Sequence, residues 1–342
     1  MAIIGGAEHT ADHLTTTIRE DLSDVITMIS PYDTPFFSML QSVAATSTKH
    51  EWIRDSLTAT TSAGALEGDQ FLGATLVDPT RSNNHTQILR KDFAVTGTNE
   101  AVTHAGMASQ FSYQMMKALR ELARNTEQAL LCQVDQTVPA GTLVAGNART
   151  MNGLYHEILD ADVAVAADNF IYDLIPTDGT GAPANTGTAL QLAEDDFNAL
   201  LQRMWTAGVA PDTVLASPAA KKDITAYAGA SIARFNVGKN DRVSNVMRYE
   251  SDFGTVDVIL ERFGPTGHGT PDGDEGRIDT VAASKTAFAF ERQHLRKATL
   301  RPTVAERLPK SGDSERGMVL HELTLEVAAV GAAGAWVNIL DD

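Results

Sequence analysis

Cysteine is nearly absent from this sequence, since Cys132 is the only one among 342 residues. A single thiol excludes an intrachain disulfide, and its place in a long helical segment favours a packed side chain over a reactive one. The first residues lack the basic and apolar regions of a secretory signal. The longest uncharged apolar run, residues 327–337, is too short to span a bilayer. We therefore expect no disulfide framework and no membrane partner.

Catalytic signatures are also missing. The sequence has no Gly-x-Ser-x-Gly elbow, no phosphate-binding loop and no dinucleotide fingerprint. Residues 252–254, Asp-Phe-Gly, copy a kinase triplet, but no kinase catalytic loop accompanies them and they lie between two strand-like segments. Residues 84–86 spell a glycosylation sequon, which has no meaning without a secretory signal. We expect neither enzymatic activity nor a cofactor.

Metal-ligand patterns are incomplete. His9 and His13 stand one helical turn apart, but no third ligand is near them in the sequence. His321-Glu322 lacks the second histidine of a zinc protease. Four carboxylates cluster in a glycine-rich stretch without the spacing of a calcium loop: Asp272, Asp274, Glu275 and Asp279. We expect a solvated acidic loop there and predict no metal site.

Basic residues are scarce relative to acidic ones. There are 27 Lys and Arg against 44 Asp and Glu, which gives a formal net charge of -17. Each contact with a nucleic-acid phosphate needs a Lys or Arg, so tight binding of nucleic acid is not expected. Hydrophobic residues make up 43% and charged residues 21% of the chain, which is typical of a globular protein.

The clearest element is a predicted helix from Ser109 to Val134. Lys117 with Glu121, and Arg124 with Glu127, are spaced to pair across one turn. A helix this long with one narrow apolar stripe needs a sheet or a neighbouring subunit to cover that stripe. Packing in a helical bundle is the alternative. The residues of the stripe recur every three or four positions: Phe111, Met115, Leu119, Leu122, Thr126 and Leu130.

Before this helix the sequence predicts an arm and an extended hairpin. A helix is expected over residues 9–29, and prolines at 31 and 35 then impose extended backbone before two phenylalanines that need burial. Residues 49–58 and 85–96 are strand-like, and a long polar segment, 59–84, joins them. A long loop without core residues is usually functional or disordered, so we expect this hairpin to lie on a partner.

After the helix, a loop-rich stretch leads to a compact α/β unit. A helix is expected over 195–207, with Phe197, Leu200, Leu201, Met204 and Trp205 on one face and a stop at Gly208. Ser217-Pro218 predicts the start of a second helix, which runs through Tyr227. Strands are expected at 213–216, 246–250, 255–260, 279–289, 300–308, 318–329 and 335–340.

This order of parts, together with several short segments, resembles a known family. The segments are Thr34 to Leu40, His50 to Leu57, Asn84 to Ile88, Val95 to Thr98, Glu121-Leu122 with Glu127 to Leu131, and Tyr249 to Gly254. They resemble the major capsid protein of tailed phages, and in particular a family similar to that of the podovirus SU-ten. Residues 135–187 match poorly. The resemblance implies an α+β protein with the Hong Kong 97-like fold.

The resemblance also implies a domain organisation. In that fold an N-terminal arm and an extended β-hairpin loop precede a peripheral β-sheet domain with a long spine helix, and an α/β axial domain meets its copies around symmetry axes. The expected divisions are the arm at 1–46, the extended loop at 47–92, the peripheral domain with its spine helix at 93–150, an insertion or connection at 151–187, the axial domain at 188–295 and the peripheral closing strands at 296–342.

The function implied is self-assembly of the chain into hexamers and pentamers of an icosahedral virus head around double-stranded DNA. The implied location is the virion, after assembly in the host cytoplasm, with a portal, decoration proteins and either a separate scaffold protein or none as further partners. No cleaved fused scaffold is expected, because only about 46 residues precede the hairpin. Contacts between copies are expected at Pro35, Phe36, Phe37, Trp52, Ile53, Leu66, Phe71 and Leu72.

Two other readings stay open at this point. An encapsulin-type nanocompartment has the same fold but is a cellular container, and its purified shells would hold a cargo enzyme without DNA. A soluble enzyme with an unrecognised site would give small particles on sizing. A tail or decoration protein explains the parts less well, because neither accounts for the hairpin, the spine helix and the α/β unit together.

Overall fold

A computed structural model describes most of the chain outside its N-terminus and several internal loops. The described residues are 33–55, 57, 67–68, 78–104, 106–133, 148–158, 171–173, 191–231, 248–263, 284–310, 312–329 and 331–340. The helix expected at 9–29, the histidines at 9 and 13 and the acidic cluster at 272–279 lie outside them. No helix in the described part of the chain is both long and apolar enough to cross a membrane.

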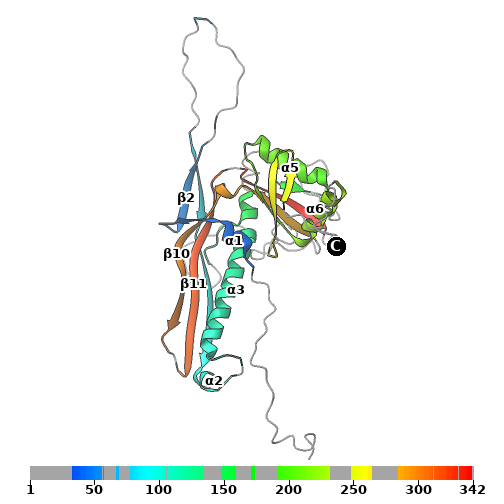
Figure 1. Cartoon of the computed structure of the whole chain (residues 1–342). Coiled ribbons are helices and arrows are strands. Elements are labelled where there is room, and N and C mark those ends of the chain that lie inside the picture. Colours follow the sequence, from blue (N-terminus) through cyan, green and yellow to red (C-terminus); the bar gives the residue numbers. More distant parts are fainter. Residues whose placement is uncertain are drawn as a thin grey trace, which may run out of the picture.

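A long four-stranded sheet and one helix form the elongated part of the molecule (Figure 1). The strand order is β1 (Gln41–Ala44), β10 (Leu295–Leu308), β11 (Ser314–Val327) and β4 (Gln87–Thr96). β10, β11 and β4 are antiparallel neighbours, whereas β1 runs parallel to β10. The helix α3 (Gln110–Cys132) packs along β4 and β11. The predicted rod is therefore confirmed, and a sheet covers it.

Local sequence explains where α3 begins, and packing decides which of its residues are buried. The side-chain oxygen of Ser109 accepts the Ser112 N–H at 3.2 Å and caps the helix. Ala118 is buried against Val319 on β11, whereas Leu119 is 38% exposed. The predicted stripe was wrong at Leu119, because the neighbouring position, Ala118, is the one that faces the sheet.

The α/β unit is built on a six-stranded mixed sheet. Its order is β5 (Ile171–Asp173), β12 (Ala333–Leu340), β9 (Ser284–Phe290), β6 (Thr213–Ala216), β8 (Gly254–Leu260) and β7 (Arg248–Ser251). The helices α5 (Glu194–Thr206) and α6 (Pro218–Ser231) pack on it. Phe197 of α5 stacks on Trp336 of β12 with ring centroids 4.8 Å apart, which fixes this helix on the sheet.

Most of the local predictions for this unit are confirmed. Gly208 ends α5 in the left-handed region with φ 93°, and the Ser217 hydroxyl caps α6 by accepting the Ala220 N–H. The turn at residues 252–253 joins β7 and β8, so the kinase-like triplet is part of a hairpin. Trp205 was placed on the buried face of α5 and is instead 57% exposed, because it lies about a quarter-turn from the middle of the face that Phe197, Leu200, Leu201 and Met204 form.

The closing strands are shared between the two sheets. β10 and β11 belong to the four-stranded sheet, but β12 pairs with β9 and β5 of the six-stranded one. The segment 296–342 was expected to form the closing strands of the peripheral sheet. Instead it contributes strands to both sheets and so connects them through one continuous stretch of chain.

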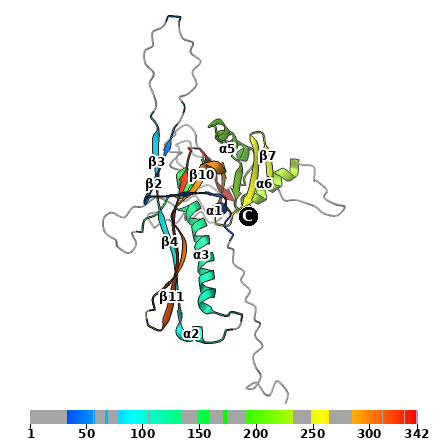
Figure 2. The same ribbon diagram turned by 60° about the vertical axis from the view of Figure 1, so that its left-hand side comes forward.

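A third, two-stranded sheet forms a stem that projects from the end of the four-stranded sheet (Figure 2). β2 (Lys49–Arg54) pairs antiparallel with β3 (Thr80–His85), with Lys49 opposite His85 and Arg54 opposite Thr80. The second strand of this hairpin was expected at 85–96, which is instead β4 in the four-stranded sheet. β3 was missed because its sequence is polar throughout and carries no apolar alternation.

Residues 154–158 are helical, and three further short helical segments are described. They are α1 (Pro35–Met39), α2 (Gly97–Ala101) and the 3-10 turn η1 (Arg292–His294). Gly106, with φ 76°, lies between α2 and α3, where the sequence predicted a kink or restart.

Candidate assembly surface

The two faces of the stem strand β2 have different surroundings. Side chains alternate across a strand, so His50, Trp52 and Arg54 share one face while Lys49, Glu51 and Ile53 share the other. The first face lies against the body of the chain, and Trp52 is 9% exposed. On the second face Ile53 is 71% exposed. Trp52 and Ile53, both predicted to contact a neighbour, therefore point in opposite directions.

The inward face of β2 is held by polar contacts to β11. Nε2 of His50 lies 2.9 Å from Oε2 of Glu326, and the Arg54 guanidinium donates to the Val327 carbonyl at 2.6 Å. The same guanidinium lies 5.4 Å from the ring centroid of Trp52 and 3.8 Å from the Glu157 carboxylate. The stem is thus anchored by side chains, not by chain connection alone.

The outward face offers an apolar residue within a charged frame. Lys49 and Glu51 are 2.6 Å apart, and Arg81 on β3 lies 3.4 Å from Glu51. Ile53 stands beside this cluster, and Leu57 beyond the end of β2 is 98% exposed. Exposed apolar residues rimmed by charged ones are typical of a protein interface.

Asn84 joins the stem to two other segments. Its amide nitrogen donates to the Leu325 carbonyl at 2.9 Å and to the Asn152 carbonyl at 3.1 Å. Its side-chain oxygen accepts the Asn152 N–H at 2.9 Å. Asn84 is fully buried, so this asparagine of the sequon is a structural residue.

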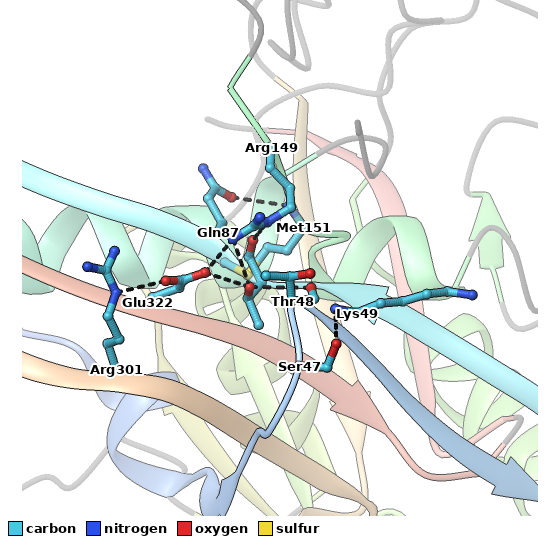
Figure 3. Close-up of polar contacts among 9 residues, drawn as sticks. Ser47, Thr48, Lys49, Gln87, Arg149, Met151, Arg301 and Glu322 are labelled. Carbon is cyan, nitrogen blue, oxygen red and sulfur yellow. Dashed lines mark hydrogen bonds and ion pairs between the residues drawn. The ribbon is translucent and has the colours of Figure 1, made fainter. Parts of the chain in front are cut away.

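A second polar joint lies where β3 passes into β4, and we call it the Glu322 joint (Figure 3). One oxygen of Glu322 accepts hydrogen bonds from Arg149 and from the Thr86 hydroxyl, at 2.8 Å for Thr86. The other accepts from Arg301 at 2.8 Å. Arg149 also donates to the carbonyl of Thr86, whose N–H donates to the Thr48 carbonyl at 2.9 Å. The joint fixes both strands of the stem to β11.

Half of β10 lies at a sheet edge that no described strand pairs with. Within the described ranges β1 pairs with residues 296–299 of β10, whereas residues 301–307 bond to β11 on one side and have no neighbouring strand on the other. These seven residues are exposed. Pro302 interrupts the row of backbone donors, a common protection of an exposed edge. This edge can accept a strand or loop of another chain.

The remaining predicted contact residues have mixed surroundings. Phe36 is fully buried inside its own chain and packs edge-on against Phe290 at 5.6 Å, so it has no surface left for a neighbour. Pro35 and Phe37 are partly buried. Leu66, Phe71 and Leu72 lie outside the described residues. Other exposed apolar side chains were not among the predicted contact residues: Ile88, Val102, Met116, Leu119, Trp205, Leu260 and Val304.

Reactive and metal-binding groups are not gathered on this surface. Cys132 ends α3, burial raises the pKa of its thiol, and the thiol donates to the Phe263 carbonyl at 3.2 Å. His321 bonds to Thr126 at 2.9 Å and to Thr303 at 3.2 Å. Within the described ranges, no three His, Cys, Asp or Glu residues are grouped so as to hold a metal ion.

Comparison with known proteins decides the family. A family model for the SU10 major capsid protein matches residues 8–340, nearly the whole chain. The chain belongs to the SU10 major capsid protein family. The resemblance inferred from the short segments is thereby confirmed.

A curated member of the capsid proteins matches part of this SU10-family chain. The major capsid protein of Escherichia phage Phieco32 is 32% identical over 107 residues, which are 31% of this chain and 30% of that protein. The matched part thus spans less than a third of that relative.

Solved structures share the fold of the SU10-family chain over almost its full length. A chain from Mycobacterium phage Bobi has a TM-score of 0.57 at 14% identity and covers 97% of this chain and 99% of its own. A chain from the mature capsid of bacteriophage PhiM1 has a TM-score of 0.53 at 12% identity, with coverages of 93% and 90%. The holo-SrpI encapsulin complex of Synechococcus elongatus gives 0.54 at 11% identity, with 98% and 96%. At these identities the likeness shows the Hong Kong 97-like fold alone.

Proposed function

We propose that this chain is the shell subunit of a tailed-phage head and assembles into hexamers and pentamers around double-stranded DNA. The observation that carries the proposal is the match of the SU10 major capsid protein family to residues 8–340. The anchored stem with its exposed Ile53, and the edge of β10 that no described strand pairs with, supply surfaces that another chain can cover. Head-to-tail contacts of this kind close into rings.

Expression of the full chain and negative-stain microscopy test this function. We expect closed shells or capsomer rings, and a well-behaved monomer at high concentration would contradict the proposal. Assembly in this proposal takes place in the host cytoplasm, with a portal and either a separate scaffold protein or none.

The encapsulin fold match makes a nanocompartment the competing function. The contents of purified particles distinguish the two, because a phage head holds double-stranded DNA and a nanocompartment holds a protein cargo.

The net charge of -17 favours a shell that does not bind the enclosed DNA tightly. We expect the free subunit to show no measurable affinity for duplex DNA at about 150 mM salt, since few phosphates can be neutralised. Binding that persists at this ionic strength would contradict this part of the proposal.

A further inference from the structure

Two buried carboxyl groups interact where α1, α3 and the end of β8 come together. Glu127, near the end of α3, is fully buried, and Glu261, directly after β8, is 3% exposed. The oxygens of Glu127 accept the backbone N–H groups of Phe36 and Phe37, each at 2.7 Å. Glu127 was expected to pair with Arg124 across the helix surface; instead its carboxyl group points inward and caps the start of α1.

Glu261 has a matching arrangement on the other side. Its Oε1 accepts the backbone N–H groups of Arg262 and Phe263, both at 2.8 Å. Its Oε2 is buried and receives no hydrogen bond from the described residues. Among the described residues, one carboxylate oxygen of the pair therefore has no donor, although a buried acceptor is normally satisfied.

The charged groups around the pair do not neutralise it fully. The positive charge of Lys297 on β10 is attracted by Glu127. The ammonium group itself donates to the Phe37 carbonyl at 2.8 Å and lies 3.7 Å from the Phe37 ring centroid. Cys132 is a neutral thiol. Arg262 and Asp33 pair at 3.8 Å on the exposed rim. Two carboxylates that share a buried site cannot both ionise without a large electrostatic cost.

We propose that buried Glu127 keeps its proton in the folded chain, donates a hydrogen bond to Glu261, and so forms a pH-sensitive lock that holds α1 and the end of β8 against the spine helix α3. With the proton in place, one carboxylic acid donates to its neighbour and the free oxygen of Glu261 gains a partner. When the proton is lost, two anions face each other and the end of β8 is pushed away from α3. The lock joins the arm-side segment to the six-stranded sheet through α3.

The direction of the pH effect follows from the proton's affinity. Burial, opposed by the Phe37 amide and reinforced by the charge of Glu261, raises the pKa of Glu127 from 4.5 to about 8. Between pH 4.5 and about 8, the folded chain therefore keeps a proton on Glu127 that the unfolded chain has already lost. The free energy of unfolding should therefore fall as pH rises through this range, and the lock should open above it.

The variant Glu261→Gln tests the lock, because its amide keeps the carbonyl acceptor for residues 262–263 and donates permanently to Glu127. We expect hydrogen–deuterium exchange protection of peptides 33–40 and 258–263, corrected for intrinsic rates, to fall between pH 6.5 and 9 in the wild type and to stay level in the variant. The wild-type melting temperature should also drop by roughly 2–4 °C more than that of the variant.

The matched control is Glu121→Gln, which removes a partly exposed carboxylate from the same helix and should leave the wild-type pH profile unchanged. The same pH profile in the wild type and Glu261→Gln would overturn the proposal. If Glu261→Gln does not fold, peptide 319–326 of β11 serves as the internal reference in the wild type. Equal loss of protection in that peptide and in 33–40 would then overturn it.

Discussion

Nε2 of His50 on the stem lies 2.9 Å from Oε2 of Glu326, a residue 276 positions later on the central strand β11. The other oxygen of Glu326 accepts from Arg296 on β10 at 3.0 Å. One buried carboxylate thus connects the stem to two strands of the four-stranded sheet. Together with the Glu322 joint it sets the direction in which the stem leaves the body, and therefore where Ile53 can meet another copy.

Loss of Glu322 should weaken the fold more than loss of an exposed carboxylate. In Glu322→Ala, Arg149 and the hydroxyl of Thr86 lose their acceptor in a buried site, which costs roughly 1–3 kcal/mol of unfolding free energy. Urea unfolding of the subunit measures this change. Glu306→Ala, on the exposed part of β10, is the matched control and should change stability by less than about 0.5 kcal/mol. Equal effects of the two substitutions would contradict the role of the Glu322 joint.

The stem should respond differently to the same charge at adjacent positions. Asn84→Asp would place a carboxylate against the carbonyl oxygens of Leu325 and Asn152, where the amide now donates. We expect lower stability and fast proteolysis near residues 48–56. Asn83→Asp, one residue earlier and directed to the other face of β3, should leave both nearly unchanged. Limited proteolysis and thermal melting compare the two, and equal tolerance of both variants would contradict the anchoring by Asn84.

Ile53 should matter for assembly and not for folding. Ile53→Asp places a charge on a surface that a neighbour would cover, so we expect fewer closed shells at an unchanged melting temperature. Ile53→Val keeps the apolar contact and is expected to assemble like the wild type. Sedimentation velocity with negative-stain microscopy gives the assembled fraction. Normal shells from Ile53→Asp would remove this residue from the interface.

Acid should destabilise the contact between α3 and β11. Burial lowers the pKa of His321 from 6.5 to about 4, so the unfolded chain binds a proton there before the folded chain does. Stability should fall as pH decreases from 6.5 towards 4, by at most roughly 3 kcal/mol from this group. His321→Gln can keep bonds to Thr126 and Thr303 without titrating, and its stability should depend less on pH in this window. Chemical unfolding at pH 7 and pH 5 measures this difference. An equal change in the free energy of unfolding for both proteins would contradict the prediction.

The elements with strong local signals could be predicted from the sequence. Ser109, Gly208 and Ser217-Pro218 mark helix ends because their side chains or backbone freedom satisfy groups within a few residues. The strand at 213–216 is bounded as predicted, since its run of buried apolar residues is short and enclosed by turns. The order of these parts was enough to indicate the family.

The candidate surface was less predictable. Ile53 and Leu57 are exposed as an interface requires, but Phe36 and Trp52 have the same apolar character and are covered by their own chain. Composition and spacing show that an apolar residue needs to be buried. They do not show whether its own chain or a neighbouring chain buries it.

The sequence by itself determined the long helices α3, α5 and α6, most strands and their order, because periodicity and capping act between residues close in the chain. Only the tertiary structure decided that the polar segment 80–85 is a strand, that Glu127 turns inward and that the last strand returns to the six-stranded sheet. Each of these depends on a partner far away in sequence, such as Leu325 for Asn84, 241 positions apart. Such pairings leave no periodic trace, since one hydrogen bond between distant segments requires no repeating pattern in either.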